Sequence, residues 1–267
     1  MTVYKYSEDV WRFIDLKVND AYTNMAIDEA IGRLRGSGLS PNTIRFYRWK
    51  PSAVSVGYFQ ITEREVNIEA CRELGVDIVR RMTGGGAVYH DYNGELTYSV
   101  IVNEDHPLIP REITKSYEVL CDGIVNALGH LGIEAEFKPI NDIVVSGKKI
   151  SGNAQTRRWG VVLQHGTILM STDIRTMFKV LRVGLTKISD KAIKSVEERV
   201  TTIRRELDRS ISFEEVSKAL RRGFEEALGI RLVDGALTKE ELNLAEERRQ
   251  TKYLTEEWNF KRPKSRL

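Results

Sequence analysis

The sequence predicts an α+β protein in which one domain spans all 267 residues and the portion after about residue 174 is helical. Up to residue 170, runs of β-branched and aromatic residues bounded by Gly and Pro, which are typical of strands, are interrupted by stretches with helical spacing. After Asp173, helical spacing and capping signals dominate. The chain has no internal repeat, low-complexity tract or long linker that would separate a second domain.

Local signals place the elements of the first 170 residues. Asn24 and Asn67 are typical helix N-caps, and Gly132 is a typical residue to end a helix. Helices are expected over residues 26–34, 68–74 and 113–131, strands over 10–18, 43–49, 53–59, 76–79, 95–102 and 161–170, and a hairpin over 143–152.

The rest of the chain is expected to be helical. Helices are expected over 174–181 and 191–199 from their apolar spacing. Two capping boxes, which begin at Ser212 and Thr238, predict two more helices. In the first of these, the residues expected to face inward are Phe213, Val216, Leu220, Phe224 and Leu228.

Composition restricts the class of protein. A net charge of +3 suits an anionic small molecule or an acidic partner and gives no reason to expect nucleic acid. Cys71 and Cys121 show no paired spacing, which argues for a reducing compartment and against a disulfide scaffold or a zinc site. The first nine residues lack an apolar signal core, and no run is long enough to span a membrane. We therefore expect a cytoplasmic protein.

Residues 80–91, with the sequence RRMTGGGAVYHD, carry the first functional signal. Three consecutive glycines suit a backbone that approaches a ligand closely, with N–H groups turned towards an anion. Arg80 and Arg81 add planar donors for phosphate or carboxylate. The alternative is a glycine-rich turn with solvated arginines. The spacing fits neither a Walker loop nor the dinucleotide fingerprint.

Two further segments share this chemistry, residues 141–155 (NDIVVSGKKISGNAQ) and 164–167 (QHGT). A lysine just past a hairpin turn can reach into a cleft and neutralise a carboxylate and a phosphate brought together, as the activation of a carboxylic acid by ATP requires. Asp142 could hold Mg²⁺ on the nucleotide phosphates. The alternative is that Lys148 and Lys149 are ordinary solvated turn lysines.

Other chemistry-bearing residues have structural interpretations. His165 is more typical of a hydrogen-bonded strand residue, and His90 of a residue that caps a turn. Asp28 and Glu29 are expected to be surface charges on their helix. Both cysteines are expected to be core residues, because they fall on apolar helix faces.

Together these segments closely resemble the lipoate–protein ligase A family, whose relatives are biotin–protein ligases and lipoyl/octanoyl transferases. The segments 45–49 (RFYRW), 55–60 (SVGYFQ) and 165–169 (HGTIL), together with the late Lys252-Tyr253 and Trp258-Asn259, extend the resemblance over nearly the whole chain. It implies a mixed, mostly antiparallel sheet flanked by helices, akin to the class II synthetase core and to biotin–lipoate ligases.

The resemblance implies a lipoate–protein ligase that uses ATP and Mg²⁺. Lipoate attacks the α-phosphate of ATP, and a lysine of a lipoyl domain, in a 2-oxoacid dehydrogenase E2 or a glycine-cleavage H protein, then attacks the lipoyl-AMP. Lys149 is expected to bridge the lipoate carboxyl oxygen and the α-phosphate, and Arg81 to contact the nucleotide. The lipoate and adenylate cradle is expected from Gly84, Gly85, Gly86, Ala87, Val88 and Tyr89, and support from His90, Asn141, Asp142, Gln155 and His165. Val88 and the strand 163–169 are expected to wall a dry slot for the acyl tail.

Two departures from the family pattern bear on the alternatives. Octanoyltransferases of this superfamily use a cysteine nucleophile, and no cysteine lies near residues 138–142 or after Cys121, which argues against an octanoyltransferase that forms an acyl-enzyme. The chain also ends within a few residues of Asn259, where full-length ligases continue into an accessory domain, so we expect a separate accessory subunit. The alternatives are an octanoyl or lipoyl transferase, fed by acyl carrier protein or by preformed lipoyl-AMP, and a non-catalytic binding protein on the same fold. Biotin is an alternative acid.

Overall fold

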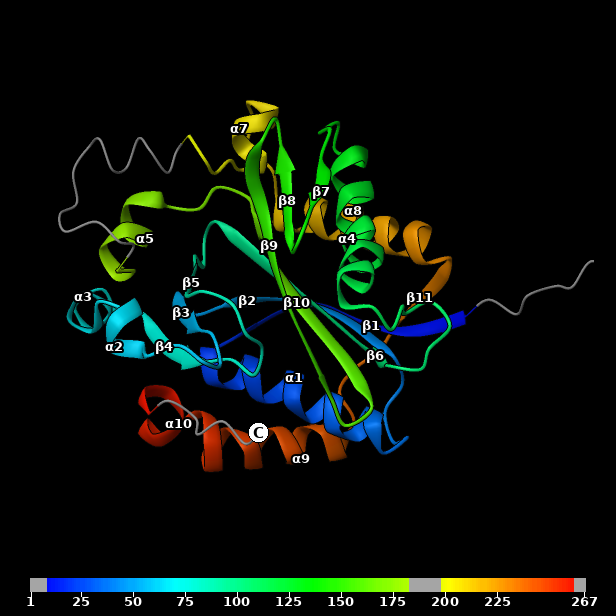
Figure 1. Ribbon diagram of the computed structural model, residues 1–267, viewed down its shortest axis with the longest axis horizontal. Coiled ribbons are helices and arrows are strands. Elements are labelled where there is room, and N and C mark those ends of the chain that lie inside the picture. Colours follow the sequence, from blue (N-terminus) through cyan, green and yellow to red (C-terminus); the bar gives the residue numbers. More distant parts are fainter. Residues whose placement is uncertain (1–8, 183–197, 262–267) are drawn as a thin grey trace, which may run out of the picture.

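The computed structural model of the chain describes residues 9–182 and 198–261. These residues form an eight-stranded and a three-stranded sheet flanked by helices, which confirms the predicted α+β class (Figure 1). In pairing order the larger sheet consists of β11 (Ile230–Asp234), β1 (Asp9–Asn19), β2 (Thr43–Trp49), β6 (Glu95–Asn103), β10 (Val161–Leu169), β9 (Lys148–Arg158), β8 (Asp142–Val145) and β7 (Glu136–Lys138).

The larger sheet is mostly antiparallel, as the resemblance implies. Only β1 runs parallel to its neighbours, β11 and β2. The smaller sheet has the order β4 (Asp77–Arg80), β3 (Ala53–Val56) and β5 (Val88–His90), with β3 parallel to β4 and antiparallel to β5. This smaller sheet carries the glycine-rich segment between β4 and β5.

Helices cover both faces of the larger sheet, because its strands are apolar on both sides. In β2, Ile44 and Phe46 belong to the core cluster under α4 (Ile113–His130) and α8 (Phe213–Leu228). Tyr47 and Trp49 belong instead to the cluster under α1 (Ala21–Gly36), with α9 (Lys239–Arg248) lying outside α1 (Figure 1). The remaining helices are α2 (Thr62–Glu65), α3 (Ile68–Glu73), α5 (Ile174–Val180), α7 (Ile203–Leu207), η1 (Arg249–Tyr253) and α10 (Glu256–Phe260). No helix among the described residues is long and apolar enough to cross a membrane.

Most expected elements are present, and the differences have local causes. Helix α1 begins at Ala21 with Asp20 as its cap, so Asn24 lies inside the helix, where its side chain accepts a hydrogen bond from Arg45. The strand expected over 53–59 ends at Val56. Three short strands were not predicted, because β5 and β7 have three residues each and β11 is interrupted by charged residues. Strand β11 also interrupts the predicted helical C-terminal portion, and the helix expected over 191–199 lies mostly outside the described residues.

A buried ion pair joins the first strand to the C-terminal helices. The guanidinium of Arg12 on β1 donates to both carboxylate oxygens of Glu241 on α9, at 2.7 and 2.5 Å. Ser40 donates to the same carboxylate, and the Glu241 side chain is fully buried. Glu241 is also the N3 residue of the capping box at Thr238, which confirms that box. A single carboxylate thus fixes the start of α9 and its position against the sheet.

Replacing Glu241 with Ala should therefore strongly destabilise the fold. The change leaves the Arg12 guanidinium buried without its counter-charge, which costs about 3–5 kcal/mol of unfolding free energy. Urea unfolding followed by circular dichroism measures this loss. Glu240→Ala, at the exposed neighbouring position, is the matched control and should change stability by no more than about 0.5 kcal/mol. Equal effects of the two substitutions would contradict this role for the ion pair.

Candidate active site

A pocket of about 430 Å³ lies between the two sheets, on the face of the larger sheet that α1 covers. One wall comes from β2, β6, β9 and β10, and the opposite wall from β3, β5 and the glycine-rich segment. The pocket has an apolar lining and a polar one. The apolar lining includes Met25, Trp49, Val88, Leu169 and Met177. Val88 and Leu169 were expected there, whereas Leu163 belongs to the core cluster under α1.

The side chain of Arg81 organises the glycine-rich segment rather than projecting into solvent. Its Nη2 donates to the carbonyl oxygens of Gly84 and Gly86, at 2.7 and 2.8 Å. Its Nη1 donates to the carbonyl and hydroxyl oxygens of Ser55, and its Nε donates to Thr83. Burial lowers the pKa of Arg81 to about 10, so the guanidinium remains charged at neutral pH. These donors are thus directed to protein oxygens, and the predicted contact with a nucleotide would require some of them to be released.

The side chain of Arg80 binds residues 57–60 and the C-terminal helix α10. It donates to the carbonyl oxygens of Gly57, Tyr58 and Gln60 and to Asn259 near the C-terminal end of the described chain. The alternative of solvated arginines is therefore wrong for both residues, which are buried. The glycine-rich segment packs closely against Gly57, because a Cβ atom at position 57 would lie 2.0 Å from the carbonyl oxygen of Gly85. Gly85 itself has φ of +94°, a conformation that favours glycine.

Lys149 is the cation that borders the pocket on the hairpin side. Its Nζ lies 2.6 Å from a carboxylate oxygen of Asp142, with the two side chains 40% and 36% exposed. The side chain lies over Gly152, where a Cβ atom would be 2.7 Å from Nζ. The backbone N–H of Lys149 donates to the carbonyl oxygen of Arg199, and the carbonyl oxygen of Lys149 accepts from the N–H of Thr201. The hairpin thus presents a positioned but accessible ammonium group.

The surroundings of Asp142 do not fit a metal held by the protein. Its carboxylate is paired with Lys149, and the described part of the chain contains no group of three His, Cys, Asp or Glu residues suited to a metal. Of the other expected supporting residues on the hairpin, Asn141 borders the pocket and Gln155 does not. Asn141 and Asn153 exchange hydrogen bonds across the hairpin and both border the pocket. Gln155 instead bonds to Gln164 and Ser116 on the far side of the sheet from the pocket.

His165 belongs to a buried network rather than standing alone in its strand. Its Nε2 lies 2.7 Å from the Thr83 hydroxyl, and its Nδ1 lies 3.5 Å from a carboxylate oxygen of Asp28. Burial alone would raise the pKa of Asp28, but the neighbouring Arg45, which donates to it at 2.7 Å, lowers that pKa instead. The prediction that Asp28 and Glu29 are surface charges is wrong. Both are buried, and Glu29 binds Lys252 and Tyr253.

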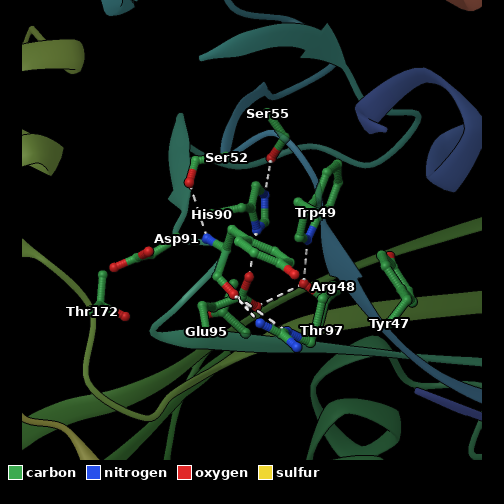
Figure 2. A network of polar contacts seen from close by, with 12 residues as sticks. Tyr47, Arg48, Trp49, Ser52, Ser55, His90, Asp91, Glu95, Thr97 and Thr172 are labelled. Atoms are coloured by element: carbon green, nitrogen blue, oxygen red, sulfur yellow. Dashed lines mark hydrogen bonds and ion pairs between the residues drawn. The ribbon is translucent and has the colours of Figure 1, made fainter. Parts of the chain in front are cut away.

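His90 occupies a second network in the pocket wall, not the turn cap that was expected (Figure 2). Its Nε2 lies 2.8 Å from the Ser55 hydroxyl and its Nδ1 lies 3.2 Å from a carboxylate oxygen of Glu95. The ring stacks on Trp49 with centroids 4.1 Å apart. Burial and the charge of Arg81 lower the pKa of His90 to about 3, and burial raises the pKa of Glu95 well above its ordinary value. No signal in the sequence linked Ser55 to His90, since that contact arises from the pairing of β3 with β5.

Neither cysteine borders the pocket. Cys71 and Cys121 are buried in core clusters, as predicted from their helix faces. Burial raises the pKa of the Cys71 thiol to about 11 and raises that of Cys121 further. A reactive cysteine normally has a lowered pKa and access to solvent. The pocket therefore offers hydroxyl, imidazole and ammonium groups, and no thiolate.

Comparison with known proteins relates this site to acyl transfer. Residues 20–225 match the family Lipoyl protein ligase A/B catalytic domain. Relatives named octanoyltransferase LipM match 94–96% of the chain at 36–40% identity. The one from Brevibacillus brevis is 39% identical over 275 residues, which cover 94% of this chain and 99% of the relative.

Solved structures give a second comparison. A bi-partite lipoate protein ligase, studied with its E2 lipoyl domain, from Thermoplasma acidophilum has a TM-score of 0.85 at 35% identity, covering 97% of this chain and 99% of its own. A lipoate-protein ligase A bound with ATP has a TM-score of 0.82 at 34% identity, covering 96% of this chain and 100% of its own. The expected likeness to lipoate ligases is confirmed at the level of fold.

The prediction of an ATP-dependent lipoate–protein ligase is wrong, because relatives that match 94–96% of the chain are named octanoyltransferase. The physical reason is that the three motif segments build a pocket and place an ammonium group at its border. A transferase requires both features as much as a ligase does. The segments therefore do not distinguish a free acid activated by ATP from an acyl group that arrives already activated.

The environment of His90 gives a pH prediction. We expect its imidazole to stay neutral from about pH 8 to about pH 5, where an ordinary histidine with a pKa of about 6.5 becomes protonated. Ring NMR signals, assigned by their loss in His90→Asn, should show no titration in this range. A midpoint near the ordinary value would contradict the buried pairing. Because only the unfolded chain protonates this group there, His90 should lower the free energy of unfolding as the pH falls through this range.

Proposed function

The chain belongs to the lipoyl protein ligase A/B catalytic domain family, and from that premise we propose that it is an acyltransferase. It transfers an octanoyl group from a carrier thioester to the lysine side chain of a lipoyl domain, without ATP. The observation that carries transfer rather than activation by ATP is the match of octanoyltransferases to 94–96% of the chain. The pocket, with its apolar lining and the accessible ammonium group of Lys149, suits the acyl substrate. The names of the relatives support the octanoyl group as the cargo.

The apolar lining suits an unbranched acyl chain. Trp49, Val88 and Leu169 come from three different strands, and Met25 from α1 and Met177 from α5 complete the lining. Ligand pockets bury small molecules on such apolar walls and use a few polar groups for orientation. We propose that the chain of the acyl group lies along this lining, with its carbonyl towards the hairpin.

Lys149 then stabilises the charge that develops during transfer. Attack on the acyl carbonyl places negative charge on its oxygen, and a preorganised cation stabilises that charge more in the transition state than in the ground state. Asp142 holds the ammonium at 2.6 Å and Gly152 leaves room for it. The glycine-rich segment, held by Arg81, forms the opposite wall.

The acceptor is proposed from the chemistry of the family. The relative from Thermoplasma acidophilum is described with its E2 lipoyl domain, and an H protein is the other expected acceptor. The free, buried cysteines are consistent with reaction in the reducing cytoplasm. ATP and Mg²⁺ were expected for the activation step and have no role in this reaction. The accessory subunit stays a prediction.

Transfer should proceed without ATP. Purified chain, an octanoyl carrier thioester and a lipoyl domain should yield the octanoyl amide at the same rate with and without ATP, as measured by intact mass. Exchange of ATP with pyrophosphate, with free octanoate or lipoate present, should not exceed the enzyme-free background. Product formed only from free acid plus ATP would refute the proposal. Transfer from preformed lipoyl-AMP but not from the thioester would show that the acyl donor is an adenylate and refute the thioester as donor.

Replacing Lys149 with Ala should lower kcat/KM for this transfer by about 10²–10³-fold, the usual cost of removing one preorganised charge-stabilising group. The fold should be unaffected, because the side chain is exposed at the pocket. Lys148→Ala, at the exposed preceding position, is the matched control and should transfer normally. A Lys149→Ala chain with unchanged transfer would instead favour a non-catalytic role for the hairpin.

A further inference from the structure

A series of hydrogen bonds between side chains runs through the sheet to the hairpin that carries Lys149. It starts at Gln155, whose Nε2 donates to Oε1 of Gln164 at 3.0 Å. Nε2 of Gln164 donates at 2.9 Å to the hydroxyl of Tyr98, which donates at 2.7 Å to Oδ1 of Asn153. We infer that Asn153 is a positioning residue for acyl transfer and that it acts through Lys149. This inference rests on the proposed acyltransferase function.

Asn153 joins β9 to the loop that leads into β8. Its Nδ2 donates to the carbonyl oxygen of Asn141 at 2.9 Å, and its backbone N–H donates to the same oxygen at 3.0 Å. In return, Nδ2 of Asn141 donates to the carbonyl oxygen of Asn153. Residues 138–140, which precede Asn141, are exposed. These hydrogen bonds therefore anchor the exposed loop to the buried part of the sheet.

The anchor lies directly beside the carboxylate that holds the ammonium group. Asp142 follows Asn141 and begins β8, and its carboxylate lies 2.6 Å from Nζ of Lys149. Just beyond Asp142 the pairing of β8 with β9 shifts its register, between Ile143 and Val144. The shift separates this carboxylate from the regular part of the hairpin. The anchor on its other side therefore determines where the carboxylate, and with it the ammonium, is held.

Burial restricts the Asn153 amide to one arrangement. Asn153 is 3% exposed, and Tyr98 is fully buried in the core cluster under α4 and α8. Gly166 lies on the strand between them and leaves room for the contact, because a Cβ atom there would be 2.0 Å from Oδ1 of Asn153. A different rotamer of the amide would leave buried polar groups unpaired, which is costly. The series thus transmits the rigidity of the core to the hairpin.

This rigidity matters for transfer, because the ammonium must meet a negative charge that develops at one place. A preorganised cation stabilises the transition state only if it is already at the correct distance from the acyl oxygen. The series reaches Lys149 through Asn141 and Asp142, whereas the acyl chain is bound by the apolar lining of the pocket. A change at Asn153 should therefore slow the chemical step and leave the binding of the acyl chain unaltered.

The test is a double-mutant cycle with Lys149. In the full-length chain, Asn153→Ala should lower kcat for transfer from an octanoyl thioester to a lipoyl domain by about tenfold, with KM for the thioester unchanged. In a Lys149→Ala chain the same substitution should have no further effect, because the group that it positions is absent. A purely structural role would lower transfer by the same factor in both chains. Intact mass of the lipoyl domain, followed over long incubations, measures the slow variants.

Tyr98→Phe tests the same series from the core. It keeps the buried ring and removes only the hydroxyl that donates to Asn153, so its effect on kcat should have the same direction and should also vanish in the Lys149→Ala chain. Thr156→Ala is the matched control, because Thr156 lies on the same strand as Asn153, opposite Leu163 and outside the series. It should transfer as the unsubstituted chain does.

Equal losses with and without Lys149 would overturn the positioning role, and so would unchanged kcat in Asn153→Ala. Either result would leave the acyltransferase function standing. If Asn153→Ala does not fold, the same comparison with Tyr98→Phe decides. Failure of the unsubstituted chain to transfer from any activated donor would instead remove the proposed function and this inference with it.

Discussion

The buried guanidinium of Arg81 is the interaction on which the pocket depends. One side chain binds the carbonyl oxygens of Gly84 and Gly86, the Ser55 strand and the Thr83 hydroxyl, and so fixes the glycine-rich segment relative to β3. A buried charge is costly unless every donor is satisfied. The segment provides those acceptors by turning its carbonyl groups inward, which a glycine with φ of +94° at position 85 permits. The shape of the wall and the burial of the charge are therefore mutually dependent.

Buried polar networks converge on the pocket from two directions. Arg45 keeps the pKa of Asp28 low, and Asp28 faces His165. Glu95 faces His90 in the other network, where no Lys or Arg of the described residues pairs with the carboxylate and burial raises its pKa. Similar carboxylate–imidazole pairs thus differ in protonation because of their neighbours. Arg81 lies between them, with one nitrogen bonded to Thr83 and another to Ser55, so both networks share one cation.

The site also shows why a lysine motif alone does not define a reaction. Lys149 over Gly152, beside Asp142, can stabilise charge on an acyl oxygen whatever group leaves from the carbonyl. Relatives named octanoyltransferase and solved structures described as lipoate ligases both match nearly the whole chain. The difference in chemistry has to come from the groups that receive or activate the acyl chain, and neither cysteine of this chain borders the pocket.

The class of fold, most of the elements and the segments that line the pocket could be predicted from the amino-acid sequence, because these depend on local patterns. Runs of β-branched and aromatic residues predicted β2 and β6, an apolar stripe predicted α4, a capping box predicted α8, and the runs around Gly85 and Lys149 indicated the walls of the site. Which charges are buried, and what they contact, depends instead on segments that are distant in the sequence. Asp28 and Glu29 have an ordinary helical surface pattern, yet both face inward because Arg45 and Lys252 reach them from distant segments. The contact between Ser55 and His90 arises from strand pairing across 35 residues, and no local pattern encodes a partner at that distance.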